Sequence, residues 1–309
     1  MSVELSIVIV SYRVKDLLRD CLASVMEQKT DGWNFEVIVV DNVSNDRTVE
    51  MIQQQFPQTT LIANEKNAGF SAANNQGMEI SKGKYIFLLN PDTVLKRNAL
   101  QTLMTFAKTQ TGLFLLGPRL ENADGSLQVS AWKQAGVMNV VAEAFFLHRA
   151  FHVSEYATET FAQPFSPAMV SGAALFFPRA LFEKIGGLDK DLFWMEDADF
   201  CRRTTEAGGK IIYLPEAVVT HLSGQSSKKN LRVAISNQLL SKLKYLRKHV
   251  GMVGMMVASL FCFLQIVSRM LLFFLLSPFS RNYREKLGAY VWTFGKFFSY
   301  LFGNDKRVT

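Results

Sequence analysis

The chain has 309 residues, of which 49% are hydrophobic, and a formal net charge of +7. This length allows one large domain or two modest ones. The charge is uneven: residues 1–221 contain 20 Lys+Arg and 25 Asp+Glu, whereas residues 222–309 contain 14 and 2. A basic, apolar C-terminal part on an acidic globular part predicts contact with an anionic membrane surface and argues against nucleic-acid binding.

The cysteines and the N-terminal residues indicate the compartment. Cys21, Cys201 and Cys262 are far apart and form no CxxC pair, which is typical of reduced thiols. Glu4 stands where a secretory signal would have basic residues, and the apolar run Ile7–Val10 is too short for such a signal. We therefore expect the catalytic part to lie in the cytoplasm.

Apolar, β-branched runs alternate with helical patterns over residues 1–117. The predicted strands are Leu5–Ser11, Phe35–Asp41, Thr60–Ala63, Tyr85–Leu89 and Leu113–Gly117, with helical patterns near 17–25, 49–56, 70–80 and 100–107. Strands buried on both faces and separated by helices are typical of parallel sheets. The sequence thus predicts an α/β domain whose first half is 1–117.

Residues 118–227 are expected to complete this domain. The predicted elements are a hairpin at Asn122–Gly125, strands at Ala174–Phe177, Ile211–Leu214 and Val218–His221, and helices at Arg179–Ile185 and Asp197–Glu206. No clear pattern covers 135–165.

Residues 228–309 predict membrane-associated helices. Val250–Ser268 contains no charge, Arg269 interrupts, and Met270–Phe279 is apolar again, whereas a spanning helix needs about 20 apolar residues. A single span would carry the basic segment 281–309 across the membrane, against the positive-inside tendency. We expect re-entrant or in-plane helices within 250–302 on the cytoplasmic face of the inner membrane, peripheral or monotopic. The alternative is a soluble helical subdomain with a buried core helix.

The segment Tyr85–Asp92 indicates a ligand site. Its apolar run ends at Asn90 and Pro91, and proline has no N–H for a strand ladder. Asp92 therefore follows the carboxyl end of a buried strand, where open α/β sheets bind ligands. Its carboxylate suits a divalent cation bound to phosphates. An Asx-Pro turn without a ligand is the alternative.

Other polar residues follow the remaining strands. Ser11 and Tyr12 end the first strand, and Asp41 and Asn42 end the second. Asp41 can accept from a base or a ribose. The alternative, an Asx-rich turn with a helix N-cap, explains Asp46 better than Asp41. The segment 64–70 offers Gly69 for a close backbone approach, and the helix after it has free N–H groups for phosphate. It is neither GxGxxG nor a Walker loop.

Two further features lie in the second half. Glu196, Asp197 and Asp199 follow the apolar Phe193-Trp194-Met195, and adjacent carboxylates indicate either a helix N-terminus or a general base in a desolvated pocket. His221 ends a strand and is a candidate metal ligand paired with Asp92.

Seven segments in this order resemble the glycosyltransferase family 2 enzymes, especially the bacterial rhamnosyltransferase-like branch. They are SIVIVSY at 6–12, VVDNVSND at 39–46, NEKNAGFSAANNQG at 64–77, YIFLLNPD at 85–92, SGAALFFPR at 171–179, GGLDKDLFWMEDADFCRR at 186–203 and HLSGQSS at 221–227. The resemblance covers about 1–227 and implies a GT-A fold, which is Rossmann-like with a mostly parallel sheet flanked by helices. It also implies that 1–117 is the nucleotide-sugar-binding half and 118–227 the acceptor and catalytic half.

The resemblance also implies residue roles. A nucleotide-diphosphate sugar would lie along Ser11, Tyr12, Asp41, Asn42, Asn67, Gly69, Asn75, Asn90 and Asp92. Asp92 and His221 would bind Mg²⁺ or Mn²⁺, with Asn90 where other members carry a second acid. Asp197 looks like the general base, with Glu196 beside it, and Phe193, Trp194 and Gly172 are expected at the acceptor.

The implied function is inverting, metal-dependent transfer of a sugar to a hydroxyl of a glycan or a polyprenyl-diphosphate-linked acceptor in bacterial cell-surface polysaccharide synthesis. dTDP-L-rhamnose is the expected donor, and UDP-GlcNAc, UDP-Gal and UDP-Glc are the alternatives. A catalytically inactive, membrane-associated sugar-nucleotide-binding scaffold is a further alternative, against which Asp92, Asp197 and His221 argue. A sugar-1-phosphate nucleotidyltransferase would need a Gly-rich loop after the first strand, which Ser11–Lys15 lacks.

Overall fold

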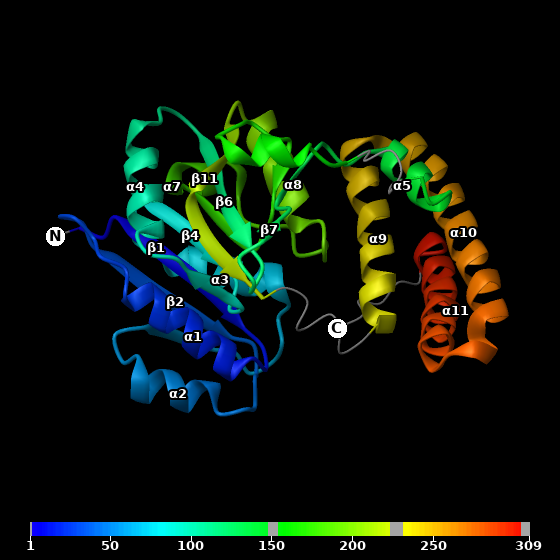
Figure 1. Cartoon of the computed structure of the whole chain (residues 1–309), viewed down its shortest axis with the longest axis horizontal. Coiled ribbons are helices and arrows are strands. Elements are labelled where there is room, and N and C mark those ends of the chain that lie inside the picture. Colours follow the sequence, from blue (N-terminus) through cyan, green and yellow to red (C-terminus); the bar gives the residue numbers. More distant parts are fainter. Residues whose placement is uncertain (1, 148–153, 223–230, 304–309) are drawn as a thin grey trace. The chain divides into compact units, whose positions relative to one another are not determined.

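The computed structural model describes residues 2–147, 154–222 and 231–303. It divides into two compact units (Figure 1). The α/β unit comprises Met1–Lys133, Tyr156–Lys190 and Glu196–Ser223, and the helical unit comprises Gln134–Glu155, Asp191–Met195 and Gly224–Thr309. Two short segments from the middle of the sequence therefore group with the C-terminal helices. Residues 223–227 of the HLSGQSS segment lie outside the described residues.

The α/β unit is built on one mixed sheet, which confirms the predicted fold class. Its strands are β1 Leu5–Ser11, β2 Phe35–Asp41, β3 Thr60–Ala63, β4 Tyr85–Leu89, β5 Thr93–Leu95, β6 Phe114–Glu121, β7 Leu127–Gln128, β10 Ala174–Pro178 and β11 Lys210–His221. The order is β3-β2-β1-β4-β10-β6-β11-β5, with β7 paired to β6. A separate two-stranded sheet pairs β8 Ala131–Trp132 with β9 Met169–Val170.

The first four strands are parallel as predicted, and the later ones depart from that pattern. β10 is antiparallel to both β4 and β6, and β5 is antiparallel to β11. The two strands predicted at Ile211–Leu214 and Val218–His221 are one strand with a register shift between Leu214 and Val218. Pro215 lies in that shift and has no N–H to donate, which accounts for the irregularity.

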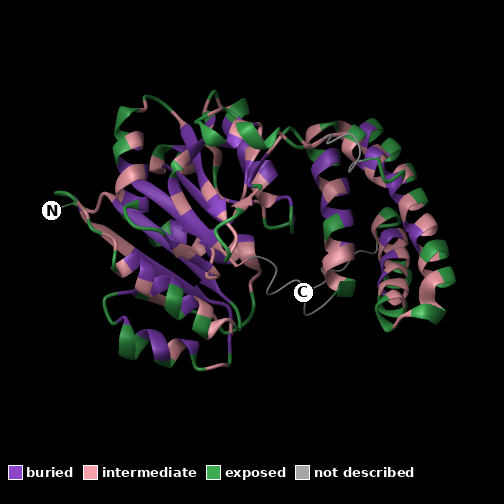
Figure 2. Cartoon of the chain, viewed as in Figure 1, coloured by how far each residue is buried: buried purple, intermediate pink, exposed green. Residues whose placement is uncertain are grey.

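Helices cover both faces of the sheet. One core cluster joins β1 residues such as Ile7 and Ile9 to α1 Lys15–Met26, α2 Thr48–Gln55 and α4 Ala99–Thr109. The other joins Val8 and Leu88 to α3 Phe70–Ile80, α7 Arg179–Ile185 and α8 Glu196–Glu206. Successive strand residues point to opposite faces, so a run apolar at every position fills both clusters. Figure 2 shows the central strands buried along most of their length.

Residue size sets how closely α3 approaches the sheet. A Cβ added at Gly77 would lie 2.3 Å from a γ-carbon of Val8, so only glycine fits at this crossing. The close approach places the N-terminal turn of α3, which begins at Phe70, beside the ends of β1 and β2. The predicted Phe70–Ile80 helix is confirmed at both ends.

The helical unit consists of α5 Val137–Ala144, α9 Leu231–His249, α10 Gly251–Leu276 and α11 Arg281–Leu301. α10 is one helix, and Gly251–Phe279 is long and apolar enough to cross a membrane by length and composition. Arg269 does not interrupt it. Its guanidinium is buried and donates to the carbonyls of Glu143 at 2.7 Å and Ala144 at 3.2 Å, at the C-terminal end of α5.

Candidate active site

Four segments that follow sheet strands place polar groups at one edge of the α/β unit. β1 pairs with both β2 and β4 in parallel, with Ser11 opposite Asp41 and Ile9 opposite Leu89. Because parallel strands end on the same side, the residues after β1, β2, β3 and β4 gather there. This edge is where the sequence predicts the donor site.

Ser11 and Asp41 are held deep in that edge. Ser11 is fully buried, and its hydroxyl has no hydrogen-bond partner among the residues that the structure describes. Asp41 is almost fully buried and accepts from the backbone N–H of Ser44 at 3.0 Å and from the Ser44 hydroxyl. The Asx turn that the sequence predicts in this region lies at Asp46, whose Oδ1 accepts from the N–H of Thr48 at 3.1 Å. Tyr12 lies outside, with its side chain exposed and the Arg13 guanidinium over its ring.

Amide side chains shape the loop between β3 and α3. Asn42 accepts from the Asn64 side chain at 2.9 Å and from the Ala68 backbone at 3.3 Å. Asn67 accepts from the N–H of Gly69 at 2.9 Å, and Gly69 has φ +84°, which favours glycine. Asn67 and Gly69, which are predicted to bind the nucleotide sugar, thus lie in one preorganised loop at the start of α3. Asn42, predicted likewise, holds this loop from the end of β2.

Asp92 and His221 meet through the antiparallel pairing of β5 with β11. Thr93 lies opposite His221 in this register. The Nε2 of His221 is 3.4 Å from the Oδ1 of Asp92, and both side chains are largely enclosed. The sequence predicted this pair from two strand ends 129 positions apart, and the structure brings them together.

Gln128 on β7 holds the other side of the imidazole. Its Oε1 lies 2.7 Å from the Nδ1 of His221, and its Nε2 donates to the His221 carbonyl at 3.2 Å. An amide oxygen can only accept, so Nδ1 carries the proton and Nε2 is free to face Asp92. Sequence reasoning missed Gln128, because only the pairing of β7 with β6 brings it to this place.

The Asp92–His221 pair fits a divalent cation. Two ligand atoms bound to one Mg²⁺ or Mn²⁺ at about 2.1 Å lie roughly 3 Å apart, close to the observed separation. Fixing one imidazole nitrogen by a hydrogen bond, as Gln128 does, is typical of metal-ligating histidines. Among the residues that the structure describes, no three His, Cys, Asp or Glu side chains converge on one point. Phosphate oxygens would complete such a site.

Asp197 lies in the first turn of α8 and is bound by backbone donors. The N–H of Gly172 donates to its Oδ2 at 3.0 Å, and the N–H of Ala198 donates to its Oδ1 at 2.7 Å. Burial raises the pKa of Asp197 above its ordinary value, and these two hydrogen bonds oppose that shift. A carboxyl with a raised pKa in a protected place has the properties of a general base. Its neighbour Glu196 begins the helix and is partly exposed.

A short segment connects the two acidic positions. The N–H of Asn90 donates to the carbonyl of Ala173 at 2.9 Å, and the adjacent Gly172 binds Asp197. A Cβ at Gly172 would lie 3.2 Å from the Cβ of Asp197, so a larger residue would press on the carboxylate. The segment Ser171–Ala173 therefore lies between the end of β4 and the start of α8. Asn90 and Asp197 both form hydrogen bonds with it, and Asp92 follows Asn90 by two residues.

Phe193 and Trp194 belong to the helical unit. Both rings are exposed, with centroids 6.3 Å apart, and the N–H of Phe193 donates to the hydroxyl of Ser241 on α9 at 3.0 Å. Trp194 has φ +82°, a strained conformation for a bulky residue. Exposed aromatic rings on a strained loop are suited to stacking on a sugar.

Comparison with known proteins agrees with this geometry. A family model described as glycosyl transferase family 2 matches residues 6–186. An N-acetylglucosaminyl-diphospho-decaprenol L-rhamnosyltransferase of Mycobacterium tuberculosis is 27% identical over 208 residues, covering 62% of this chain and 67% of the relative. An uncharacterized glycosyltransferase of Haemophilus influenzae is 24% identical over 248 residues, covering 79% and 76%.

Solved structures share the fold. The mannosyltransferase PcManGT from Pyrobaculum calidifontis, in complex with GDP-Man and Mn²⁺, has a TM-score of 0.57 at 15% identity and covers 99% of this chain and 89% of its own. GalNAc-T7 with UDP, GalNAc and Mn²⁺ has a TM-score of 0.56 at 17% identity, and the match covers 76% of this chain and 47% of that chain. Because the family model spans more than half of the chain, the protein belongs to glycosyl transferase family 2 and is a glycosyltransferase.

Proposed function

We propose that the protein transfers a sugar from a nucleotide diphosphate to an acceptor hydroxyl with inversion, using Asp197 as the general base. The observation that carries the proposal is the carboxylate of Asp197, enclosed beside Gly172, next to the strand end that holds Asp92. Asp197 would take the proton of the acceptor hydroxyl as that oxygen attacks the anomeric carbon. The nucleoside would lie against Asp41, and its diphosphate would lie toward the first turn of α3.

Asp92 and His221 would hold Mg²⁺ or Mn²⁺ at the diphosphate. When bound, the cation offsets the negative charge that develops on the leaving diphosphate. The contribution of the chain is to present one carboxylate oxygen and one imidazole nitrogen 3.4 Å apart, with Gln128 fixing the imidazole. The solved complex of PcManGT with GDP-Man and Mn²⁺, which shares this fold, supports a divalent metal here.

The proposed donor is dTDP-L-rhamnose, and the proposed acceptor is a polyprenyl-diphosphate-linked sugar or a glycan. The support is the M. tuberculosis relative, whose name combines a rhamnosyl transfer with a decaprenol-linked diphosphate sugar. UDP-GlcNAc, UDP-Gal and UDP-Glc remain the alternative donors. Phe193 and Trp194 would stack on the acceptor sugar, and Gly172 would leave space for it.

A donor panel tests the proposal directly. The purified full chain is incubated with each of these nucleotide sugars, with a lipid-linked N-acetylglucosamine acceptor, and with Mg²⁺, Mn²⁺ or EDTA. We expect metal-dependent transfer from dTDP-L-rhamnose and inverted anomeric stereochemistry in the product by NMR. Transfer from a UDP-sugar alone would correct the donor, and nucleotide-sugar binding without hydrolysis or transfer would favour the inactive scaffold.

The helical unit is proposed to attach the enzyme to one leaflet of the membrane, on its cytoplasmic side. Its polarity is inside out: buried polar side chains include Ser236, Ser259, Arg269 and Thr293. In contrast, large apolar side chains of α10 are exposed, among them Val253 at 75%, Met256 at 61% and Leu275 at 68%. Figure 2 shows this exposure along α10. Such a surface suits lipid, and the basic residues of α9 suit anionic head groups.

We expect the full chain to float with vesicles that contain anionic phospholipid, and Met256→Glu with Leu260→Glu to reduce the bound fraction at least tenfold. Both side chains are exposed on α10, so the change removes apolar contact and adds repulsion without touching a core. Sucrose-gradient flotation is the measurement, and Ile80→Glu on the α/β unit is the control. A wild-type chain that stays unbound and dimerises through this face would overturn the assignment.

A further inference from the structure

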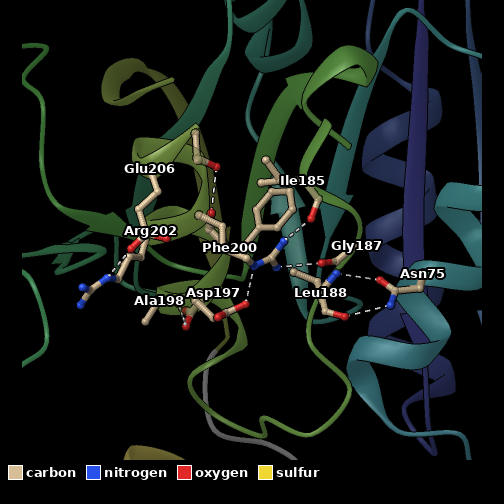
Figure 3. Close-up of polar contacts among 12 residues, drawn as sticks. Asn75, Ile185, Gly187, Leu188, Asp197, Ala198, Phe200, Arg202 and Glu206 are labelled. Atoms are coloured by element: carbon tan, nitrogen blue, oxygen red, sulfur yellow. Dashed lines mark hydrogen bonds and ion pairs between the residues drawn. The ribbon is translucent and has the colours of Figure 1, made fainter. Parts of the chain in front are cut away.

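Arg203 connects the helix of the proposed base to the turn that precedes it. Its Nε donates to Asp199 at 2.7 Å, its Nη1 to the carbonyl of Ile185 at 2.7 Å, and its Nη2 to the carbonyl of Gly187 at 2.7 Å (Figure 3). The Asp199 side chain is fully buried and that of Arg203 is 17% exposed. The guanidinium fork thus binds α8 to the end of α7 through three directed bonds.

The adjacent Arg202 has a different environment. Its Nε donates to Glu206 at 2.9 Å, four residues along the same helix, and the Glu206 side chain is 54% exposed. Figure 3 shows this pair directed away from the turn at Gly187. Arg203 therefore bridges α8 to another element, whereas Arg202 pairs with Glu206 on the same helix.

Asn75 on α3, which is predicted from the sequence to bind the donor, has both polar atoms of its amide bound to Leu188, and it continues the connection beyond Gly187. Its Oδ1 accepts from the N–H of Leu188 at 2.8 Å, and its Nδ2 donates to the carbonyl of the same residue at 2.9 Å. A Cβ at Gly187 would lie 2.2 Å from this Oδ1, so the approach requires glycine. Arg203 and Asn75 thus bind Gly187 and Leu188, neighbouring residues of one turn that Figure 3 labels.

We propose that Arg203 and Asn75 are positioning residues, which hold α8, and with it Asp197, in a set place relative to α3. The proposal rests on the proposed role of Asp197 as the base. α3 starts at the donor loop around Gly69, and α8 carries Asp197 in its first turn. The turn at Gly187–Leu188 is the segment that both side chains bind. This connection fixes the distance between the donor sugar and the Asp197 carboxylate. The acceptor hydroxyl must lie between them to attack the sugar and give its proton to Asp197.

The chemistry of the two residues supports positioning over general stability alone. Buried Asp199 would be satisfied by a lysine at position 203, yet an ammonium cannot reproduce the planar fork that reaches two carbonyls as well. An aspartate at position 75 would keep the acceptor for Leu188 N–H and lose the donor to its carbonyl. Both changes therefore loosen the turn. Arg203→Lys keeps the positive charge, and Asn75→Asp keeps the shape of the side chain.

The test uses the full chain with Arg203→Lys, Asn75→Asp and the control Arg202→Ala. We expect the two test variants to lower kcat at saturating donor and acceptor by about 10- to 100-fold. Donor Kd by calorimetry should stay within about twofold, and Arg202→Ala should match wild type. The double variant should lose less than the product of the single losses, because both residues act on one turn.

A carboxyl NMR titration of Asp197 gives a readout independent of turnover. If the connection keeps this carboxylate enclosed, both variants should move its pKa toward the ordinary value, and the control should not. A loss of kcat equal to the loss of folded protein, with the Asp197 pKa unchanged, would reduce the connection to a stabilising one. Weaker donor binding by Asn75→Asp with unchanged kcat would assign Asn75 to the donor site. Absence of transfer by wild type would instead contradict the proposed function.

Discussion

Replacing Asp197 with Asn is expected to lower turnover by about 10²- to 10⁴-fold while donor affinity is retained. The amide has nearly the same shape and can still accept from the N–H of Gly172, but it cannot take a proton from the acceptor. Initial rates at saturating substrates and donor titration by calorimetry measure the two effects. Glu206→Gln, an exposed acid on the same helix, is the control.

Glu196→Gln separates the two adjacent acids. Glu196 also lies in the first turn of α8, and a role beside the base predicts a smaller loss than that of Asp197→Asn. If Glu196→Gln is inactive and Asp197→Asn retains near-wild-type turnover, the base is Glu196. The loss of turnover in Gly172→Ala should lie between those of Glu196→Gln and Asp197→Asn, because the added Cβ would displace the Asp197 carboxylate by a few tenths of an ångström.

The same carboxyl predicts a pH dependence with a definite sign. Asp197 serves as a base only when ionised, so kcat should fall as the pH falls through its pKa, at a higher pH than for an ordinary aspartate. Because burial raises this pKa, the folded state binds the proton more tightly than the unfolded state. Ionised Asp197 therefore costs stability above the ordinary pKa. The free energy of unfolding of wild type should fall as the pH rises through this range, and Asp197→Asn should remove this dependence.

Replacing Asp92 with Ala is expected to abolish the metal dependence of donor binding. Wild type should bind the donor more weakly in EDTA than in Mn²⁺, and the variant should bind equally weakly in both, because it lacks the carboxylate of the proposed pair. Calorimetry measures donor binding, and Mn²⁺ electron paramagnetic resonance measures the cation itself. Asp20→Ala, an exposed acid on α1, is the control. Full metal dependence in the variant would contradict the assignment.

His221 and Gln128 extend this test beyond the carboxylate. His221→Ala should weaken Mn²⁺ affinity, and Gln128→Leu should do so by about 10- to 100-fold, because it leaves the imidazole free to turn and to change tautomer. Nitrogen NMR of His221 should report the proton at Nδ1 in wild type and a mixture in the variant. Unchanged tautomer and affinity in Gln128→Leu would remove Gln128 from the site.

The first four sheet strands could be read from the sequence for a physical reason. Strands covered by helices on both faces are apolar at every position, and they end abruptly in polar residues, as at Asp41 and Asn90. β10 shows the limit of this signal. Its sequence is equally apolar, but burial on two faces does not depend on strand direction, so the pattern does not reveal that β10 is antiparallel to β4.

The candidate site divides in the same way. The acids at strand and helix ends, Asp92 and Asp197, were identifiable because charged residues next to apolar runs are unusual. Gln128 carried no such signal, because an amide on a short hairpin is common. Whether Arg202 or Arg203 binds the turn at Gly187 likewise depends on which side of α8 faces that turn, and this is set by packing.

By itself, the sequence determined the first four strands with the helices between them, the acidic strand-end and helix-start positions, and an apolar, basic C-terminal part. These depend on local periodicity and composition, which each segment carries independently. Only the tertiary structure decided the pairing of β5 with β11 that brings Asp92 to His221, and the burial of Arg269 against the end of α5. Such pairings join residues more than a hundred positions apart, so their geometry depends on the register and packing of the whole chain.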